Sequence, residues 1–209
     1  MTKTIVFFGD SITHCNKNKP NSGSFDLGEG YVYLLDKKIK VTHSNIDFKI
    51  INQGLNGNRS IDLVKRIDKD VLSYNPYIMI LLIGINDIWR QFDSLHIKEY
   101  QITNEEYSCN VETIIKKAID NKILPYVCSP FYLDINNQDS FRIKVLEYNE
   151  ILLTLCKKYN LQFINLQKAY DRFLLKHPYT EISSDKIHMN KKGHEIITLS
   201  IYTKLKDLL

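Results

Sequence analysis

The chain has 209 residues and a mass of 24.5 kDa, the size of one domain that buries a core without disulfides or metals. Apolar residues make up 44% and charged residues 25%, which excludes a disordered tail, a collagen-like repeat and a membrane protein. The net charge of +4 is mixed along the chain without a concentrated basic stripe, so we expect no nucleic-acid partner and no membrane partner.

Strands and helices are predicted to alternate along the chain. Short apolar, β-branched and aromatic runs predict strands, and apolar residues at helical spacing predict helices. In chain order we expect strand 4–8, helix 31–39, strand 48–51, helix 60–72, strand 77–83, helix 103–120, strand 123–128, helix 141–159, strand 161–165 and helix 191–208. The run 77–83 is almost continuously apolar, as expected for a strand covered on both faces.

This alternation predicts the fold class. Parallel strands joined by right-handed helical crossovers form a sheet with helices on both faces. We therefore expect an α/β fold, a three-layer α/β/α sandwich around an open five-stranded parallel sheet, as a single domain over residues 1–209. In such sheets ligands bind beyond the carboxyl ends of the strands, so the residues that follow each strand are the candidate site.

Small and polar residues follow each predicted strand at that end. The segments are 9–11 (Gly-Asp-Ser), 52–59, 84–90, 129–132 and, beyond a short helix, 185–188 (Asp-Lys-Ile-His). The opposite ends of the strands carry plain turns. This asymmetry predicts an enzyme.

The residue types at these positions fit acyl transfer. A serine hydroxyl becomes a strong nucleophile only when a base takes its proton, and a histidine with an ordinary pKa near 6.5 suits that task. Ser11 is the candidate nucleophile and His188 the candidate base. Asp185 would orient one nitrogen of the His188 ring and leave the other to face Ser11.

The same segments supply candidate donors for an oxyanion hole. A tetrahedral intermediate needs converging N–H groups. The backbone N–H of Ser11, the backbone N–H of Gly57 and the side-chain amide of Asn86 could provide them. Asp10 and Asp87 are expected to buttress the turns that carry these groups.

Each of these features alone also fits an ordinary structural role. Gly-Asp-Ser can be a turn with a helix cap, and His188 can be a surface or cap histidine. Asp185 and Asn86 can be plain turn residues. The functional interpretation rests on the four segments occurring in order, each at or just beyond the carboxyl end of a predicted strand.

These segments resemble the GDSL esterase family, also called SGNH hydrolases. The matching blocks are Gly9-Asp10-Ser11, residues 52–57, Gly84-x-Asn86-Asp87 and Asp185-x-x-His188. Together they span almost the whole chain. The resemblance implies a flavodoxin-like sandwich and hydrolysis of esters by a serine, with no metal and no other cofactor.

The resemblance also implies roles for individual residues. By block matching, Ser11, Asp185 and His188 form a catalytic triad. Ser11, Gly57 and Asn86 form the oxyanion hole, with the donor of the second block at its second glycine, Gly57.

A narrower resemblance is to the intracellular xylan acetylesterase branch of the family. It is carried by Gly28-x-Gly30-Tyr-Val, by residues 84–93 and by Pro130-Phe-Tyr-Leu. It implies removal of acetyl groups from xylo-oligosaccharides and assembly into homo-oligomers. The chain departs from the branch at Met189, where those enzymes usually have a proline after the histidine.

The loops bear on the substrate. Residues 16–30 and 133–140 are polar and lack the apolar face of a lipase lid, which favours a short acyl group on a polar alcohol such as a sugar. The candidate substrate-binding residues are Asp10, Tyr31, Arg59, Trp89 and Phe131, and the three aromatic rings would stack on a pyranose. The predicted function is therefore hydrolysis of short-chain esters, most simply acetyl esters of sugars.

Three other functions fit parts of the sequence. A lysophospholipase- or thioesterase-like acylhydrolase of the same family is the main alternative, and preference for acyl length decides it. A metallophosphoesterase would need denser Asp, His and Asn clusters. The third is a non-catalytic sugar- or nucleotide-binding module. Neither GxGxxG nor GxxxxGK[ST] occurs, which weighs against nucleotides, and the complete triad and oxyanion set weigh against a role in binding alone.

The cysteines and the N-terminus bear on location. The four cysteines have neither a CxxC spacing nor a histidine at metal-ligand spacing, so we expect free thiols in a reducing compartment. Only residues 5–8 form an apolar run after the first four, too short for a signal peptide. These features predict a cytoplasmic protein.

Overall fold

The computed structural model of the protein describes residues 3–18, 26–43, 47–206 and 208. Within these residues the strands are β1 (Lys3–Gly9), β2 (Phe48–Gly54), β3 (Ile78–Leu82), β4 (Leu124–Cys128) and β5 (Gln162–Ile164). They form one sheet in the order β2-β1-β3-β4-β5, and every neighbouring pair is parallel.

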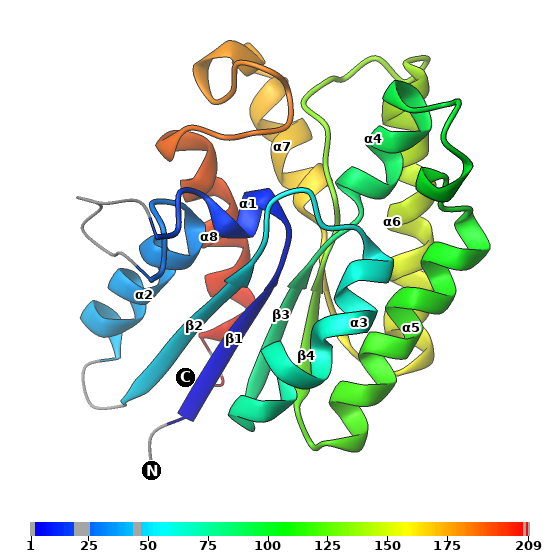
Figure 1. The fold of residues 1–209 in the computed structure, drawn as a ribbon. Helices are drawn as coiled ribbons and strands as arrows, with labels where there is room; N and C mark the ends of the chain where they lie inside the picture. The colour runs from blue at the N-terminus through cyan, green and yellow to red at the C-terminus, as the bar shows by residue number, and fades with distance from the viewer. Residues whose placement is uncertain (1–2, 19–25, 44–46, 207, 209) are drawn as a thin grey trace.

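Helices cover both faces of the sheet. The helices are α1 (Ser11–His14), α2 (Tyr31–Thr42), α3 (Ser60–Asp70), α4 (Ile85–Asp93), α5 (Asn104–Asp120), α6 (Ser140–Lys158), α7 (Leu166–Leu174) and α8 (Lys191–Leu205). Figure 1 shows α2 and α8 on one face and α3, α5 and α6 on the other. This arrangement confirms the predicted α/β/α sandwich with a five-stranded parallel sheet.

Local sequence explains why these elements form. All five residues of β3 are buried, because helices cover both of its faces. Helix α5 begins at a capping box, in which the Thr103 side chain accepts from the N–H of Glu106 and the Glu106 side chain accepts from the N–H of Thr103. Asp139 and Asn190 cap α6 and α8 through their side-chain oxygens.

The carboxyl ends of the strands lie level with one another. Gly9 at the end of β1 pairs with Gly54 of β2 and Leu82 of β3. Leu82 pairs in turn with Cys128 of β4, and Cys128 with Ile164 of β5. The segments that follow these strands are therefore brought to one edge of the sheet, where α1 and α4 also lie (Figure 1).

The longest element that the sequence did not predict follows β3. Residues 84–90 were identified as a candidate site segment with no helix predicted, and the structure places most of them in helix α4. Gly84 has φ of +131°, a conformation that only glycine adopts readily, and this lets the chain turn from β3 into the helix. A Cβ at Gly84 would also lie 2.7 Å from the hydroxyl of Tyr107.

The remaining predictions concern the cysteines, the loops and the domain count. Cys15, Cys109, Cys128 and Cys156 are free thiols, as predicted. Residues 19–25 of the predicted 16–30 loop lie outside the described residues. No helix of the described chain is long and apolar enough to cross a membrane. A single domain over residues 1–209 stays a prediction.

Candidate active site

Ser11 lies on a tight turn between β1 and the rest of α1. The Asp10 carboxylate caps this turn by accepting a hydrogen bond from the N–H of Ile12 at 2.9 Å. A Cβ at Gly9 would lie 2.4 Å from both the Leu82 carbonyl oxygen and the Thr13 hydroxyl, so the turn requires a glycine there. The result is a serine hydroxyl held at the carboxyl edge of the sheet.

The structure brings Ser11, His188 and Asp185 into one hydrogen-bonded line. The Oγ of Ser11 lies 3.0 Å from Nε2 of His188, across 177 positions of sequence. On the other side of the ring, Nδ1 of His188 lies 2.7 Å from Oδ2 of Asp185. Because Nδ1 donates to the carboxylate, Nε2 is left to accept the serine proton.

Asp185 is fixed by its own loop. Its Oδ1 accepts the backbone N–H of Ile187 at 2.9 Å and that of His188 at 2.7 Å, and the Ser183 hydroxyl donates to it at 3.1 Å. Partial burial alone would raise the pKa of this carboxyl, but the hydrogen bonds from His188 and Ile187 lower it to about 2. The carboxylate is therefore ionised at neutral pH and can stabilise a charged imidazole.

The three predicted oxyanion donors lie around the same cleft. Ser11, Gly57 and Asn86 all line it. The side-chain amide of Asn86 donates one N–H to the Asn58 carbonyl at 3.0 Å, which orients the group and leaves its second N–H for another acceptor. Gly57 has φ of +76° and open space where a Cβ would be, so its backbone can be approached closely.

The cleft itself is open and mixed in character. Its volume is about 610 Å³, and its lining combines the residues above with Trp89, Arg90 and Met189. The Trp89 ring lies 6.2 Å from the His188 ring, measured between centroids. Trp89 is thus the candidate substrate-binding residue that the structure does bring to the cleft.

Two other proposed substrate residues, Tyr31 and Phe131, are in the core. Both are 0% exposed. The Tyr31 hydroxyl lies 2.8 Å from the Thr13 hydroxyl, and the Phe131 ring packs against Tyr170 at 4.5 Å. Stacking of these two rings on a sugar was therefore wrongly predicted, because other side chains already cover them.

Asp10 and Arg59 do not line the cleft either. Asp10 is 1% exposed beneath the Ser11 turn, and burial, with a smaller contribution from nearby Asp87, raises its pKa to about 7. The Arg59 guanidinium donates to the Glu99 carbonyl at 3.0 Å and stacks over Tyr100. Asp10 is therefore too deeply buried to contact a substrate, and that prediction was wrong. Arg59 is not among the described residues that line the cleft, and its role in substrate binding stays a prediction.

The buttressing role expected of Asp87 is visible in its contacts. Asp87 is fully buried and accepts hydrogen bonds from both the backbone N–H and the hydroxyl of Ser60, at 3.0 and 2.5 Å. These bonds tie the first residue of α3 to the first turn of α4. The segments that carry Gly57 and Asn86 are thereby held together.

Sequence reasoning missed Arg66, which also holds this edge together. From α3 its guanidinium donates to the carbonyls of Gly9 and Gln53, at 2.9 and 3.0 Å, and to the side chain of Asn58 at 2.7 Å. Its position beside the apolar Ile67 on a predicted helix was the available signal. A charged side chain on a helix is usually solvated, so the charge of Arg66 did not indicate this role.

The surroundings of Cys15 do not favour a cysteine nucleophile. Cys15 lines the cleft, but burial and the charge of Glu29 raise the pKa of its thiol to about 11. A thiol with that pKa holds its proton at neutral pH and is a weak nucleophile. Its Sγ lies 3.2 Å from Nε2 of the buried His194.

A parallel α/β/α sheet with a serine, histidine and carboxylate aligned at its carboxyl edge is typical of hydrolases that use an activated serine. The sequence profile of the GDSL-like lipase/acylhydrolase family matches residues 7–196. The acetylxylan esterase of Geobacillus stearothermophilus is 30% identical over 198 residues, which cover 92% of this chain and 89% of that protein.

Solved structures agree with these sequence matches. A crystal structure of Axe2, an acetylxylan esterase from Geobacillus stearothermophilus, superposes with a TM-score of 0.92 at 27% identity, covering 97% of this chain and 94% of that one. LAE5, an alpha/beta hydrolase enzyme from the metagenome of Lake Arreo, superposes at 0.93 and 27% identity, covering 100% and 98%. The chain belongs to the GDSL-like lipase/acylhydrolase family and is a carboxylic ester hydrolase.

Proposed function

We propose that the protein is a serine esterase that removes short acyl groups, most simply acetyl, from sugars such as xylo-oligosaccharides. The observation that carries the proposal is the line from Ser11 Oγ through the His188 ring to Asp185, with distances of 3.0 and 2.7 Å. Catalytic mutants of Axe2 replace a serine, an aspartate or a histidine by alanine, and its aspartate and histidine are three positions apart, as Asp185 and His188 are here.

The proposed reaction has two halves. In the first, Nε2 of His188 takes the Ser11 proton while Oγ attacks the ester carbonyl, and the resulting oxyanion accepts hydrogen bonds from Ser11, Gly57 and Asn86. The tetrahedral intermediate then expels the alcohol, which receives the proton from His188, and an acyl-serine remains. In the second, His188 activates a water that attacks the acyl-serine, releasing the acid and restoring the Ser11 hydroxyl.

Two observations support a sugar ester as the substrate. The cleft is open and carries polar side chains together with the single tryptophan, Trp89, whose ring can stack on a pyranose. The relatives named as acetylxylan or acetyl-xylooligosaccharide esterases cover most of the chain. Trp89 is therefore proposed to contact the alcohol side of the substrate.

The test compares p-nitrophenyl acetate, butyrate and octanoate, and then acetylated xylo-oligosaccharides, with the wild type and Ser11→Ala. We expect rapid acetate hydrolysis that falls by about 10⁴-fold or more in the variant, because no other described group is placed to attack. Circular dichroism checks that the variant is folded. Activity that survives Ser11→Ala would overturn the triad, and a preference for octanoate would favour a lysophospholipase- or thioesterase-like function.

A further inference from the structure

Residues 183–189 carry Asp185 and His188, and we call them the base loop. The His188 side chain lines the cleft and is 47% exposed, and the Asp185 side chain is 40% exposed. The base loop is closed by an antiparallel bridge between Ser183 and Met189, and the side chain of Ile187 is buried. These contacts anchor its ends and one side chain, and a further contact holds its middle.

That contact comes from residues 130–139, which connect β4 to α6 and which we call the support loop. Asp134 Oδ2 lies 2.7 Å from Nζ of Lys186, the residue between Asp185 and Ile187. The Leu133 N–H donates to the Lys186 carbonyl at 3.0 Å. Lys186 itself has φ of +68°, a left-handed conformation that is uncommon for a residue other than glycine, at the position that the support loop contacts.

Two aromatic rings flank the Lys186 ammonium in addition to its ion pair. It lies 5.5 Å from the centre of the Tyr132 ring and 5.3 Å from that of Tyr179. Its hydrogen bond to Asp134 raises its pKa, and the same bond lowers the pKa of Asp134 although burial opposes this. Both groups are therefore charged throughout the neutral range.

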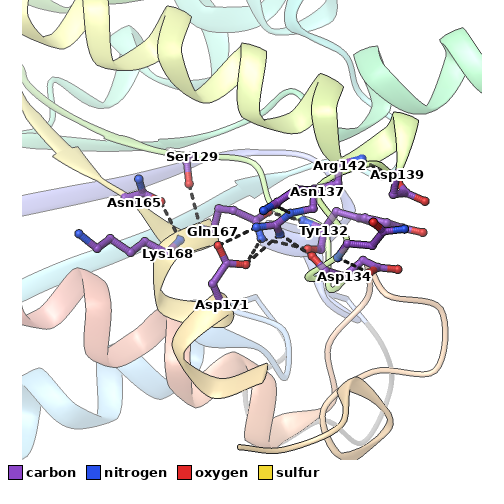
Figure 2. A network of polar contacts seen from close by, with 11 residues as sticks. Ser129, Tyr132, Asp134, Asn137, Asp139, Arg142, Asn165, Gln167, Lys168 and Asp171 are labelled. Carbon is purple, nitrogen blue, oxygen red and sulfur yellow. Dashed lines mark hydrogen bonds and ion pairs between the residues drawn. The ribbon is translucent and has the colours of Figure 1, made fainter. Parts of the chain in front are cut away.

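Asp134 is held in turn by Arg142, which is 6% exposed. The Arg142 guanidinium donates to the Asp134 carbonyl and, at 3.0 Å, to the side chain of Asn137, so it fixes the support loop at two points. It also forms a two-pronged ion pair with Asp171 of α7, at 2.9 and 3.0 Å. Figure 2 shows these side chains converging between α6 and α7.

The network continues to the sheet. The Gln167 side chain accepts the Tyr132 N–H at 2.8 Å, donates to the Tyr132 carbonyl at 3.1 Å and donates to Asp171 at 2.7 Å. The Ser129 hydroxyl, at the end of β4, accepts the N–H groups of Leu166 and Gln167 (Figure 2). A continuous polar path therefore links the end of β4 and the start of α7 to the middle of the base loop.

We propose that Asp134 and Lys186 are positioning residues for ester hydrolysis, which set the place of the His188 ring relative to Ser11 by bracing the base loop against the Arg142 network. The inference rests on the proposed function, because it assigns the two residues to the triad. Its physical reason is that the His188 side chain is 47% exposed, so burial against the core holds its ring only in part. A displacement of about 1 Å at a reacting group can cost up to roughly 10²-fold in rate.

The experiment uses Lys186→Met, Asp134→Asn, the double variant and Lys186→Arg in the full chain. Methionine keeps an aliphatic stem between the two tyrosines, and asparagine keeps the shape of Asp134 and an acceptor for the N–H of Asn136. Lys117→Met is the matched control, because it removes a 2.7 Å ion pair with Asp68 on the surface of α5 and α3. Ser11→Ala is measured in parallel.

For p-nitrophenyl acetate we expect kcat to fall about tenfold in each single variant while KM stays within about twofold. The kcat of the double variant falls no further than that of either single variant, since both substitutions remove the same ion pair. Lys186→Arg keeps most of the wild-type kcat, because arginine can still pair with Asp134. The kcat of Lys117→Met equals that of the wild type. Melting temperatures fall by about 4 °C or less, because the Lys186 and Asp134 side chains are partly exposed, at 29% and 21%, and such ion pairs add little stability.

Several results would overturn the inference. One is a kcat within twofold of the wild type in both single variants. A second is a kcat in the double variant that falls by the product of the two single losses. A third is a kcat in Lys186→Arg as low as in Lys186→Met. If Ser11→Ala keeps its activity, the proposed function itself fails, and that result is distinguishable from failure of the brace alone.

Discussion

A carboxamide with one N–H already bound is a well-defined donor. Asn86 is 6% exposed, and its bond to the Asn58 carbonyl fixes the side chain before any substrate arrives. An orientation set in advance costs no reorganisation when charge develops on the substrate oxygen. The contribution of Asn86 should therefore appear in the rate of reaction rather than in substrate affinity.

Asn86→Ala tests this reasoning. We expect kcat for p-nitrophenyl acetate to fall by roughly 10²- to 10³-fold with little change in KM, the usual cost of one oxyanion donor. The control is Asn121→Ala, which removes an exposed side-chain amide that donates a hydrogen bond to the Lys117 carbonyl at the end of α5. An equal rise in KM without a change in kcat would instead assign Asn86 to ground-state binding.

His194 is a second residue whose neighbours determine its chemistry. It is 3% exposed, and its Nδ1 accepts the Tyr31 N–H at 3.3 Å while Nε2 faces the Cys15 thiol. Burial, with a smaller effect of nearby His188, lowers its pKa to about 4. The folded protein thus prefers neutral His194, whereas the unfolded chain takes up a proton below about pH 6.5.

This shift predicts a pH-dependent stability difference between the wild type and His194→Gln, which cannot titrate there. The contribution of neutral His194 is fully present above pH 6.5 and is lost as the pH falls through about 4. The stability advantage of the wild type should shrink by about 3 kcal/mol over that window. Urea unfolding at pH 7.5, 6, 5 and 4 measures it, and a constant difference would contradict the shift.

At the scale of elements, the Arg66 side chain connects α3 to the ends of β1 and β2 and to the segment after β2 that carries Gly57. Arg66 donates to the ends of β1 and β2 and to Asn58, pairs with Asp70 at 2.8 Å and stacks on the Phe8 ring. Its side chain is 13% exposed. Removing it would take the Arg66 hydrogen bonds away from the carbonyls of Gly9 and Gln53, although the Leu55 N–H would still donate to Gly9. Losing several partly buried hydrogen bonds is more costly than losing a surface ion pair.

Arg66→Met should therefore lower the free energy of unfolding by about 2–4 kcal/mol and also reduce kcat. Guanidinium unfolding and p-nitrophenyl acetate hydrolysis report the two effects. Arg172→Met, at an exposed position of α7, should stay within about 0.5 kcal/mol of the wild type. If Arg66→Met and the control prove equally stable, the hydrogen bonds of Arg66 would not contribute to the free energy of unfolding.

At the scale of the whole molecule, the level carboxyl ends of the strands bring distant segments to one edge. Ser11 follows β1, Asn86 follows β3, and His188 lies beyond β5 and α7. Each segment contributes one or two groups, and no segment carries the reaction alone. The proposed chemistry consists of proton transfer and hydrogen bonding among these side chains.

We therefore expect ester hydrolysis to be independent of added metal ions. Prolonged incubation with EDTA, followed by assay with p-nitrophenyl acetate, should leave kcat unchanged, because His188 activates the nucleophile and N–H groups stabilise the oxyanion. Loss of activity in EDTA that zinc or manganese restores would contradict the serine mechanism and favour a metal-assisted one.

Most of the fold could be predicted because its signals are local. Apolar runs and helical spacing place the five strands and five of the longer helices close to their observed bounds, as for β4, predicted over 123–128 and found over Leu124–Cys128. Helix α4 escaped prediction because its amphipathic residues overlap the site segment 84–90. Gly84, which precedes it, has φ of +131°, and a side chain there would meet the Tyr107 hydroxyl of α5, a contact that the local sequence does not reveal.

The sequence by itself determined the fold class, the family and which residues the proposed triad and oxyanion hole would use, because each lies in a short segment with a fixed place after a strand. Only the tertiary structure decided which aromatic rings reach the cleft. Trp89 does, whereas Tyr31 and Phe131 are sealed into the core by helices distant in sequence. It also revealed Arg66 and the pair of Asp134 with Lys186, since burial and pairing depend on what packs against a side chain.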